Sequence, residues 1–242
     1  MKNWHQLYKQ QQFLPLWWSI FINPFFIVRR GLYLNIKKYA PLLQGKLLDF
    51  GCGRKPYQDL FQVEEYIGLD TEQSGHPHEG EERSQIDVFY DGNTIPLPEE
   101  SFDAVFSSEV FEHVFELEHS LSEINRILKP KGKLLFTTPF VWDEHEIPYD
   151  FGRYSQYGLK HILEKKGFTV INISKSGHFI TTLTQLQALY VFHLLRTPNK
   201  YLNIVLCTLF ITPILCIGIL IGAIFPKIRS LYLNTIVLAE KN

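Results

Sequence analysis

The stretch Leu47–Tyr57, LLDFGCGRKPY, decides the fold of this chain. The short run Lys46–Phe50, which overlaps its start, predicts a buried parallel strand. The run breaks at Gly51-Cys52-Gly53, where the glycines let a ligand lie against the backbone. A second short strand, Tyr66–Leu69, leads to Asp70, whose carboxylate is placed to accept hydrogen bonds from ribose hydroxyls. The pattern predicts the nucleoside-binding first half of a doubly wound α/β sheet.

The residues after the second glycine argue against a dinucleotide. The fingerprint G-x-G-x-x-G requires a third glycine for close packing of helix against strand. Pro56 stands at that position here, so NAD and FAD match poorly.

The segment Asp49–Gly53, D-x-G-x-G, instead resembles motif I of the class I S-adenosylmethionine-dependent methyltransferases. The resemblance implies that Asp49 helps to fix the loop and the cofactor, that Asp70 holds the ribose, and that Asp87 in QIDV receives the adenine amino group. It implies cofactor contacts from Asp49, Gly51, Gly53, Asp70, Asp87, Val88, Ser107 and Glu109.

The block Ile95–Val114 resembles the fourth-strand region of small-molecule methyltransferases. The resemblance covers Lys46 to about Ile173 and implies a mostly parallel, seven-stranded Rossmann-like sheet with an antiparallel last strand. The expected elements are a strand opened by 101–103 and finished by 104–107, and a helix that starts over 109–113. The segment 121–128, a turn over 129–133, and strands over 134–138 and 168–174 follow.

Charge is segregated along the chain although the formal net charge is only −1. Residues 1–48 and 165–239 each contain seven Lys or Arg and no Asp or Glu. Basic residues interleaved with aromatic and aliphatic ones favour an anionic membrane surface as partner over nucleic acid.

The cysteines and histidines do not predict a metal site. Cys52, Cys207 and Cys216 have no zinc-like spacing, and their number does not suit a disulfide framework, which favours a reducing, cytoplasmic compartment. His76 and His78 flank a proline in a polar loop without a third ligand at a helical spacing.

Two apolar flanks carry the membrane hypothesis. Phe13–Val28 contains sixteen uncharged residues rich in Trp and Phe, which predicts an interfacial helix or a buried N-terminal helix. Ile204–Phe225 has 22 uncharged residues, enough to cross a bilayer. Leu231–Ala239 reads as the last strand, so both ends of the insertion lie on one side and the crossings number zero or two. Phe179–Leu195 is expected to complete a helical hairpin; a soluble cap or a dimer interface is the alternative.

These segments predict four regions. They are an N-terminal membrane-interface segment (1–44), a methyltransferase core (45–178), a helical hairpin insertion (179–226) and the last strand of the core (227–242).

Two blocks at the carboxyl ends of strands carry the catalytic candidates. His145 is the first choice as general base and His113 the second, while Asp150 and Arg153 are candidates that also suit a structural ion pair. Tyr154 completes this set of catalytic candidates.

The sequence therefore predicts a methyltransferase that uses S-adenosylmethionine at the cytoplasmic face of the membrane, on a lipid-linked or amphipathic acceptor. The alternatives are a non-catalytic scaffold that binds the cofactor, and a soluble methyltransferase whose apolar flanks form a dimer interface.

Overall fold

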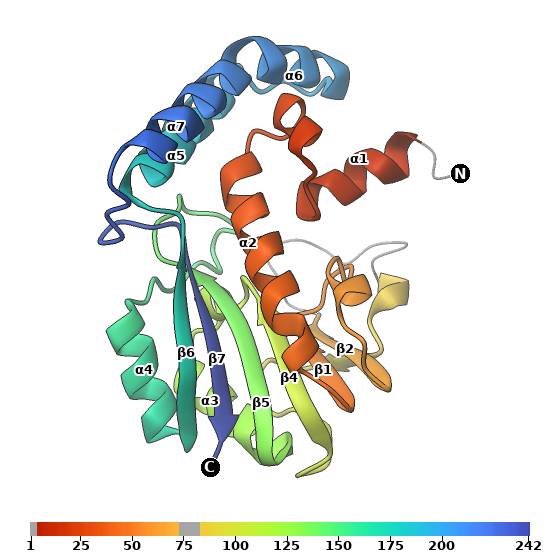
Figure 1. Cartoon of the computed structure of the whole chain (residues 1–242). Helices are drawn as coiled ribbons and strands as arrows, with labels where there is room; N and C mark the ends of the chain where they lie inside the picture. Colours follow the sequence, from red (N-terminus) through yellow and green to blue (C-terminus); the bar gives the residue numbers. More distant parts are fainter. Residues whose placement is uncertain (1–3, 73–82) are drawn as a thin grey trace. The chain divides into compact units, whose positions relative to one another are not determined.

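A single seven-stranded sheet organises the computed structural model, which describes residues 4–72 and 83–242. The strand order is β3-β2-β1-β4-β5-β7-β6 (Figure 1). The strands are β1 (Lys46–Phe50), β2 (Glu65–Thr71), β3 (Val88–Tyr90), β4 (Phe102–Ser108), β5 (Leu128–Pro139), β6 (Phe168–Ser176) and β7 (Asn234–Lys241). This confirms the predicted fold class.

β7 runs antiparallel to β6, whereas β1 to β5 are paired in parallel. The Leu233 amide donates to the carbonyl of Ser176 at the end of β6, and the Asn242 amide donates to the carbonyl of Gly167 just before its start. β7 also lies between β5 and β6, so the strand that follows the apolar hairpin is an interior strand of the sheet. The strand predicted over 231–239 is therefore present, over Asn234–Lys241.

Two helices pack against the sheet through an apolar core. The helices are α3 (Leu117–Ile127) and α4 (Gln156–Lys165). Leu121 and Ile124 of α3 and Leu159 and Leu163 of α4 are buried in one cluster with Phe168 and Val237 of the sheet. The apolar positions of α3 recur at three- and four-residue spacing, which explains why one face of this helix is buried.

The chain divides into two compact units. A sheet unit contains residues 36–174 and 235–242, and a helical unit contains residues 1–35 and 175–234. The sheet unit carries strands β1 to β5 and nearly all of β6 and β7. The helices of the other unit are α1 (Trp4–Phe13), most of α2 (Phe26–Tyr39), α5 (Phe179–Leu195), α6 (Lys200–Leu206) and α7 (Thr212–Ile224).

The helical unit contains a tightly packed hairpin. A π-helical turn over Cys207–Ile211 joins α6 to α7, and α7 packs against α5. A Cβ at Gly218 would lie 2.1 Å from the hydroxyl oxygen of Thr184, so only glycine permits this approach. Within the described residues, Lys200–Ile224 is the one helix that is long and apolar enough to cross a membrane.

The N-terminal apolar segment is not one helix. The interfacial helix predicted over Phe13–Val28 is wrong in its extent, because the chain forms α1, a short 3₁₀ helix (Trp17–Phe21) and α2. Pro15 and Pro24 lie in the two breaks, since proline lacks the amide that a continuous helix needs. The buried Gln185 side chain accepts from the amides of Ile27 and Val28 and donates to the carbonyl of Pro24, which satisfies backbone groups at the second break.

Two further boundary predictions differ from the structure. The helix predicted to start at Glu109 begins only at Leu117, after a 3₁₀ turn at Phe111–His113. Residues 129–133, predicted as a turn, lie within β5. The pairing with β4 nevertheless jumps from Leu128 to Lys133, so the residues between them bulge from the ladder.

We expect that Ile236→Ala in β7 lowers the free energy of unfolding by about 2–5 kcal/mol, because it leaves a cavity in a well-packed core. Ile236 is 1% exposed. The matched control is Ile171→Ala in β6, whose side chain is 49% exposed and whose loss should cost less than about 1 kcal/mol. Denaturant unfolding of the purified full chain measures both values, and equal effects would contradict an interior position for β7.

Candidate active site

The glycine turn after β1 forms the floor of the site. Gly51 has a φ of 74° and Gly53 a φ of 46°, in the left-handed region that glycine adopts without strain. A Cβ at Gly51 would lie 2.4 Å from the Val110 side chain, so the turn packs directly against the segment after β4. Gly51 and Gly53 both line the adjacent cavity, so the turn presents backbone to a ligand there.

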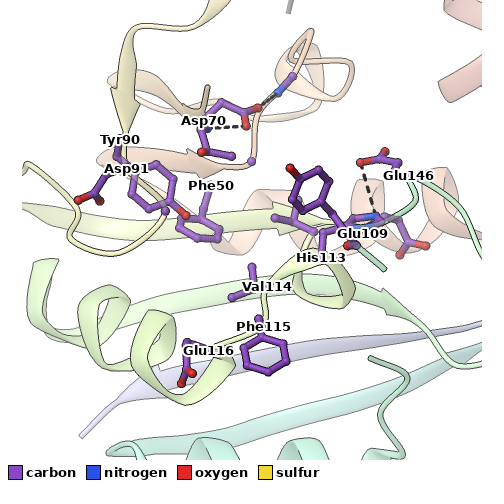
Figure 2. Close-up of a pocket in the computed structure, with 16 residues that line it drawn as sticks. Phe50, Asp70, Tyr90, Asp91, Glu109, His113, Val114, Phe115, Glu116 and Glu146 are labelled. Carbon is purple, nitrogen blue, oxygen red and sulfur yellow. Dashed lines mark hydrogen bonds and ion pairs between the residues drawn. The ribbon is translucent and has the colours of Figure 1, made fainter. Parts of the chain in front are cut away.

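Asp70 fixes this turn from the end of β2. Its Oδ2 accepts from the Gly53 amide at 2.7 Å and its Oδ1 from the Thr71 amide at 2.8 Å. The side chain is nearly buried, but Asp70 still lines the cavity (Figure 2). Each carboxylate oxygen has a second lone pair, so Asp70 can also accept hydrogen bonds from a ligand's hydroxyls.

The cavity beside this turn has a volume of about 330 Å³. Its walls come from the carboxyl ends of β1, β2 and β3, from the segment after β4 and from the loop after β5, which is where open α/β sheets bind ligands. The lining residues used below are Gly51, Gly53, Asp70, Glu109, His113, Phe115, Glu146 and Tyr149. The glycine cradle and Asp70 fit an adenosyl group in one part of this cavity.

Asp49 and Asp87 support the turn without lining the cavity. Asp49 is buried and accepts from the Tyr66 hydroxyl at 2.6 Å, and burial raises its pKa to about 7 although that hydrogen bond opposes the shift. Asp87 accepts from the Gly68 amide and from the Lys55 ammonium group. The adenine role assigned to Asp87 stays a prediction.

The other predicted cofactor residues divide in two. Gly51, Gly53, Asp70 and Glu109 line the cavity. Val88 is half-buried at the start of β3, and Ser107 is fully buried within β4, so the structure does not bring these two to the cavity wall.

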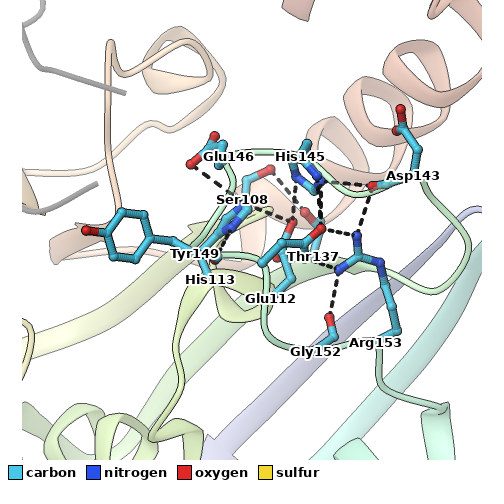
Figure 3. Close-up of polar contacts among 11 residues, drawn as sticks. Ser108, Glu112, His113, Thr137, Asp143, His145, Glu146, Tyr149, Gly152 and Arg153 are labelled. Atoms are coloured by element: carbon cyan, nitrogen blue, oxygen red, sulfur yellow. Dashed lines mark hydrogen bonds and ion pairs between the residues drawn. The ribbon is translucent and has the colours of Figure 1, made fainter. Parts of the chain in front are cut away.

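The two histidine candidates meet. His113 lies in the 3₁₀ turn after β4, and His145 lies in the loop after β5. Their rings make an edge contact with centroids 4.7 Å apart (Figure 3). Burial lowers the pKa of His113. The role of base assigned to His145 stays a prediction.

Glu112 lies beneath the two rings, and sequence reasoning missed it. Its side chain is fully buried, and burial raises its pKa well above the usual value. Its backbone carbonyl accepts from the amides of Phe151 and Gly152, which holds the loop after β5 in place. The sequence signal that could have identified Glu112 is its position next to His113, four residues after the end of β4.

Asp150 and Arg153 form an ion pair that shapes the same loop. Arg153 Nη2 donates to Asp150 Oδ2 at 2.8 Å, and this hydrogen bonding holds the pKa of Asp150 at about 2. Asp150 also accepts from the His145 amide at 3.0 Å. Tyr154 packs against the apolar core, and neither it nor the ion pair lines the cavity. These residues position the loop in this structure.

Comparison with known proteins agrees with this geometry. The family described as Methyltransferase domain matches residues 48–136. Residues 48–136 therefore form a methyltransferase domain of the class I, S-adenosylmethionine-dependent type. S-adenosylmethionine is the cofactor of this class of domain, and its contacts with the glycine turn and Asp70 stay a prediction.

Individual relatives match over part of their length. A probable S-adenosylmethionine-dependent methyltransferase of Mycolicibacterium smegmatis is 33% identical over 38% of this chain and 37% of its own. A malonyl-[acyl-carrier protein] O-methyltransferase of Methylococcus capsulatus is 31% identical over 46% of this chain and 43% of its own. The matches thus span less than half of these curated relatives.

One solved structure illustrates how far the fold alone reaches. The [4+2]-cyclase SpnF superposes with a TM-score of 0.55 at 18% identity, over 98% of this chain and 96% of that chain. Its name describes a cyclase, so a shared fold does not by itself fix the reaction.

We expect that Asp70→Ala weakens the binding of S-adenosylhomocysteine about 10- to 100-fold, because a hydrogen bond to a charged group contributes about 1.5–3 kcal/mol. Calorimetry on the full chain measures this effect. The control Asp59→Ala changes an exposed aspartate that does not line the cavity and should bind normally. Unchanged binding in the Asp70 variant would contradict the site.

Proposed function

We propose that this chain transfers the methyl group of S-adenosylmethionine to an oxygen of a lipid-linked or amphipathic acceptor at the cytoplasmic face of a membrane. The observation that carries the proposal is the make-up of the cavity. Its lining includes the glycine turn and Asp70 as well as His113, Tyr149 and Phe115, and Figure 2 shows Asp70 apart from His113 and Phe115. A single cavity therefore offers room for donor and acceptor together.

The mouth of the cavity suits an apolar acceptor. The Phe115 and Tyr149 side chains both contact Phe151 edge-to-face, and all three are exposed. Ile147 in the same loop is exposed as well. Exposed aromatic and aliphatic side chains grouped at a cavity mouth mark a binding surface for apolar ligands. The malonyl-[acyl-carrier protein] relative acts on an acyl carrier substrate by its name, which supports an acyl or lipid-like acceptor.

The chemistry is a direct displacement. An acceptor oxygen forms a bond to the methyl carbon while the carbon–sulfur bond breaks, and sulfur keeps the electron pair and becomes a neutral thioether. The acceptor's hydroxyl proton leaves for a base or for water. The residues of the cavity align the two molecules, and such alignment supplies a large part of the rate acceleration.

The helical unit supports the membrane part of the proposal. The most apolar 18-residue window of Lys200–Ile224 has a mean hydropathy of 2.8, and only 28% of that window is buried within the protein. Basic residues flank it, namely Lys200 at its start and Lys227 and Arg229 after its end. Because β6 and β7 pair in one sheet, the segment between them leaves and re-enters the same unit. This connectivity favours insertion without a net crossing.

The proposed activity is tested with methyl-labelled S-adenosylmethionine and total membrane lipids of the source organism. We expect label to enter the solvent-extractable fraction with the full chain and with Asp59→Ala. It should fall at least tenfold with Asp70→Ala at limiting cofactor. Binding of S-adenosylhomocysteine without any transfer to lipid, protein or small-molecule fractions would favour the non-catalytic scaffold.

We expect the full chain to float with anionic liposomes on a density gradient. Leu220→Glu combined with Ile224→Glu places charge on exposed apolar positions of α7 and should abolish flotation. The control Ile171→Glu, half-exposed on β6, should still float. A stable dimer that forms in detergent-free buffer and does not float would favour the soluble alternative.

A further inference from the structure

Three side chains converge on one point, and one of them, His113, lines the cavity. Glu112, His113 and His145 each present one ligand atom, and these atoms lie within 4.8 Å of one another. Glu112 Oε1 is 3.8 Å from His113 Nε2 and 4.0 Å from His145 Nε2 (Figure 3). These separations are too long for hydrogen bonds. The cluster comes from two loops that follow neighbouring strands, β4 and β5.

Both imidazole rings are oriented by their other nitrogen. His113 Nδ1 lies 2.8 Å from the carbonyl oxygen of Tyr149, and His145 Nδ1 lies 3.2 Å from that of Asp143. A carbonyl only accepts hydrogen bonds, so each Nδ1 carries a proton, and Nε2 is the nitrogen whose lone pair is available in the neutral ring. Histidines that ligate metals are held in this way, by a hydrogen bond from the second ring nitrogen to a carbonyl or carboxylate.

The Glu112 carboxylate lacks the partners that burial demands. Its side chain is fully buried, and among the described residues neither oxygen has a hydrogen-bond partner. A buried polar group without a hydrogen-bond partner is costly. The Nε2 atoms of the two histidines lie 3.8 and 4.0 Å from Oε1, so neither gives it a hydrogen bond. A cation at the point of convergence satisfies the carboxylate and both Nε2 atoms at once.

The distances fit a shared ion. Zinc binds histidine nitrogen and carboxylate oxygen at about 2.0–2.2 Å, so two tetrahedral ligands lie about 3.4 Å apart. The observed 3.8 and 4.0 Å separations need a contraction of well under 1 Å. Glu146 Oε2 lies 3.9 Å from His113 Nε2, on the side of the cavity. Glu146 is placed to be a fourth ligand of the ion, and a substrate oxygen could replace it at that position.

We propose that Glu112, His113 and His145 bind a divalent transition-metal ion of the Zn²⁺ class. Two imidazoles and one carboxylate with a position open to a cavity form the ligand set of catalytic zinc sites. The sequence predicted no metal site, since its three ligands are not regularly spaced. His76 and His78, the two histidines of the polar loop, lie outside the described residues.

The role of the ion rests on the proposed function. An ion next to the acceptor part of the cavity holds an acceptor hydroxyl and lowers its pKa, so that the oxygen attacks the methyl group at neutral pH. His145 is then a ligand through Nε2 rather than the base that the sequence predicted. The acceptor class becomes a hydroxyl compound whose oxygen can approach the ion.

The test uses the full chain, stripped with a chelator and dialysed, with Zn²⁺ and Co²⁺ as the only probes. We expect calorimetry to give one Zn²⁺ per chain, and Co²⁺ to give the visible absorption of a nitrogen- and oxygen-ligated site. His145→Gln and His113→Gln should each weaken Zn²⁺ binding at least tenfold. The controls are His161→Gln on the exposed face of α4 and the double variant His76→Gln/His78→Gln, which should bind normally.

Glu112→Gln is the sharpest variant, and its thermal unfolding is measured beside it because Glu112 is buried. If that variant unfolds, the two histidine variants carry the test. Absence of Zn²⁺ binding, or binding that these variants leave unchanged, overturns the metal site. S-adenosylhomocysteine binding is measured in parallel on every variant. Loss of metal binding with normal cofactor binding supports the proposal, whereas methyl transfer that persists at full rate after chelation overturns the ion's role and leaves the proposed function standing.

Discussion

The candidate site depends on the parallel pairing of β1 with β2 on one side and β4 on the other. Phe50 is paired with Leu69, and Leu48 with Val105, so the three strands end at one edge of the sheet. This register alone therefore brings three features together. They are the glycine turn after β1, the Asp70 carboxylate at the end of β2 and the 3₁₀ turn with His113 after β4. The loop after β5 joins them because β5 continues the same parallel ladder.

The cofactor part of the site was predictable because its contacts follow directly from strand ends. The Gly53 amide reaches Asp70 once two adjacent parallel strands are in register, and the sequence contains both strands and both residues at the expected spacing. β1 occupies the predicted residues, Lys46–Phe50. The helix breaks near Pro15 and Pro24 could also be predicted from the sequence, since proline interrupts helices. The prediction of a helix over Phe13–Val28 followed from the uncharged, Trp- and Phe-rich composition of that segment and not from its two prolines.

The cluster around Glu112 was not predictable from local pattern. Its geometry arises where the loop after β5 docks, because the amides of Phe151 and Gly152 bond to the Glu112 carbonyl. Those contacts join residues almost forty positions apart, and the conformation of the loop is set by the ion pair of Asp150 with Arg153. Sequence reasoning had identified both histidines as important. The sequence does not indicate that the Nε2 atoms of both histidines lie close to the buried Glu112 carboxylate.

The place of β7 in the strand order constrains how this chain matures. β7 lies between β5 and β6, yet it follows the apolar hairpin in sequence. During synthesis from the amino end, the edges of β5 and β6 stay unpaired until the whole hairpin has been made. Exposed strand edges beside an exposed apolar hairpin favour aggregation. Aggregation of the nascent chain is reduced if α5 packs against α7 before β7 pairs with β5 and β6.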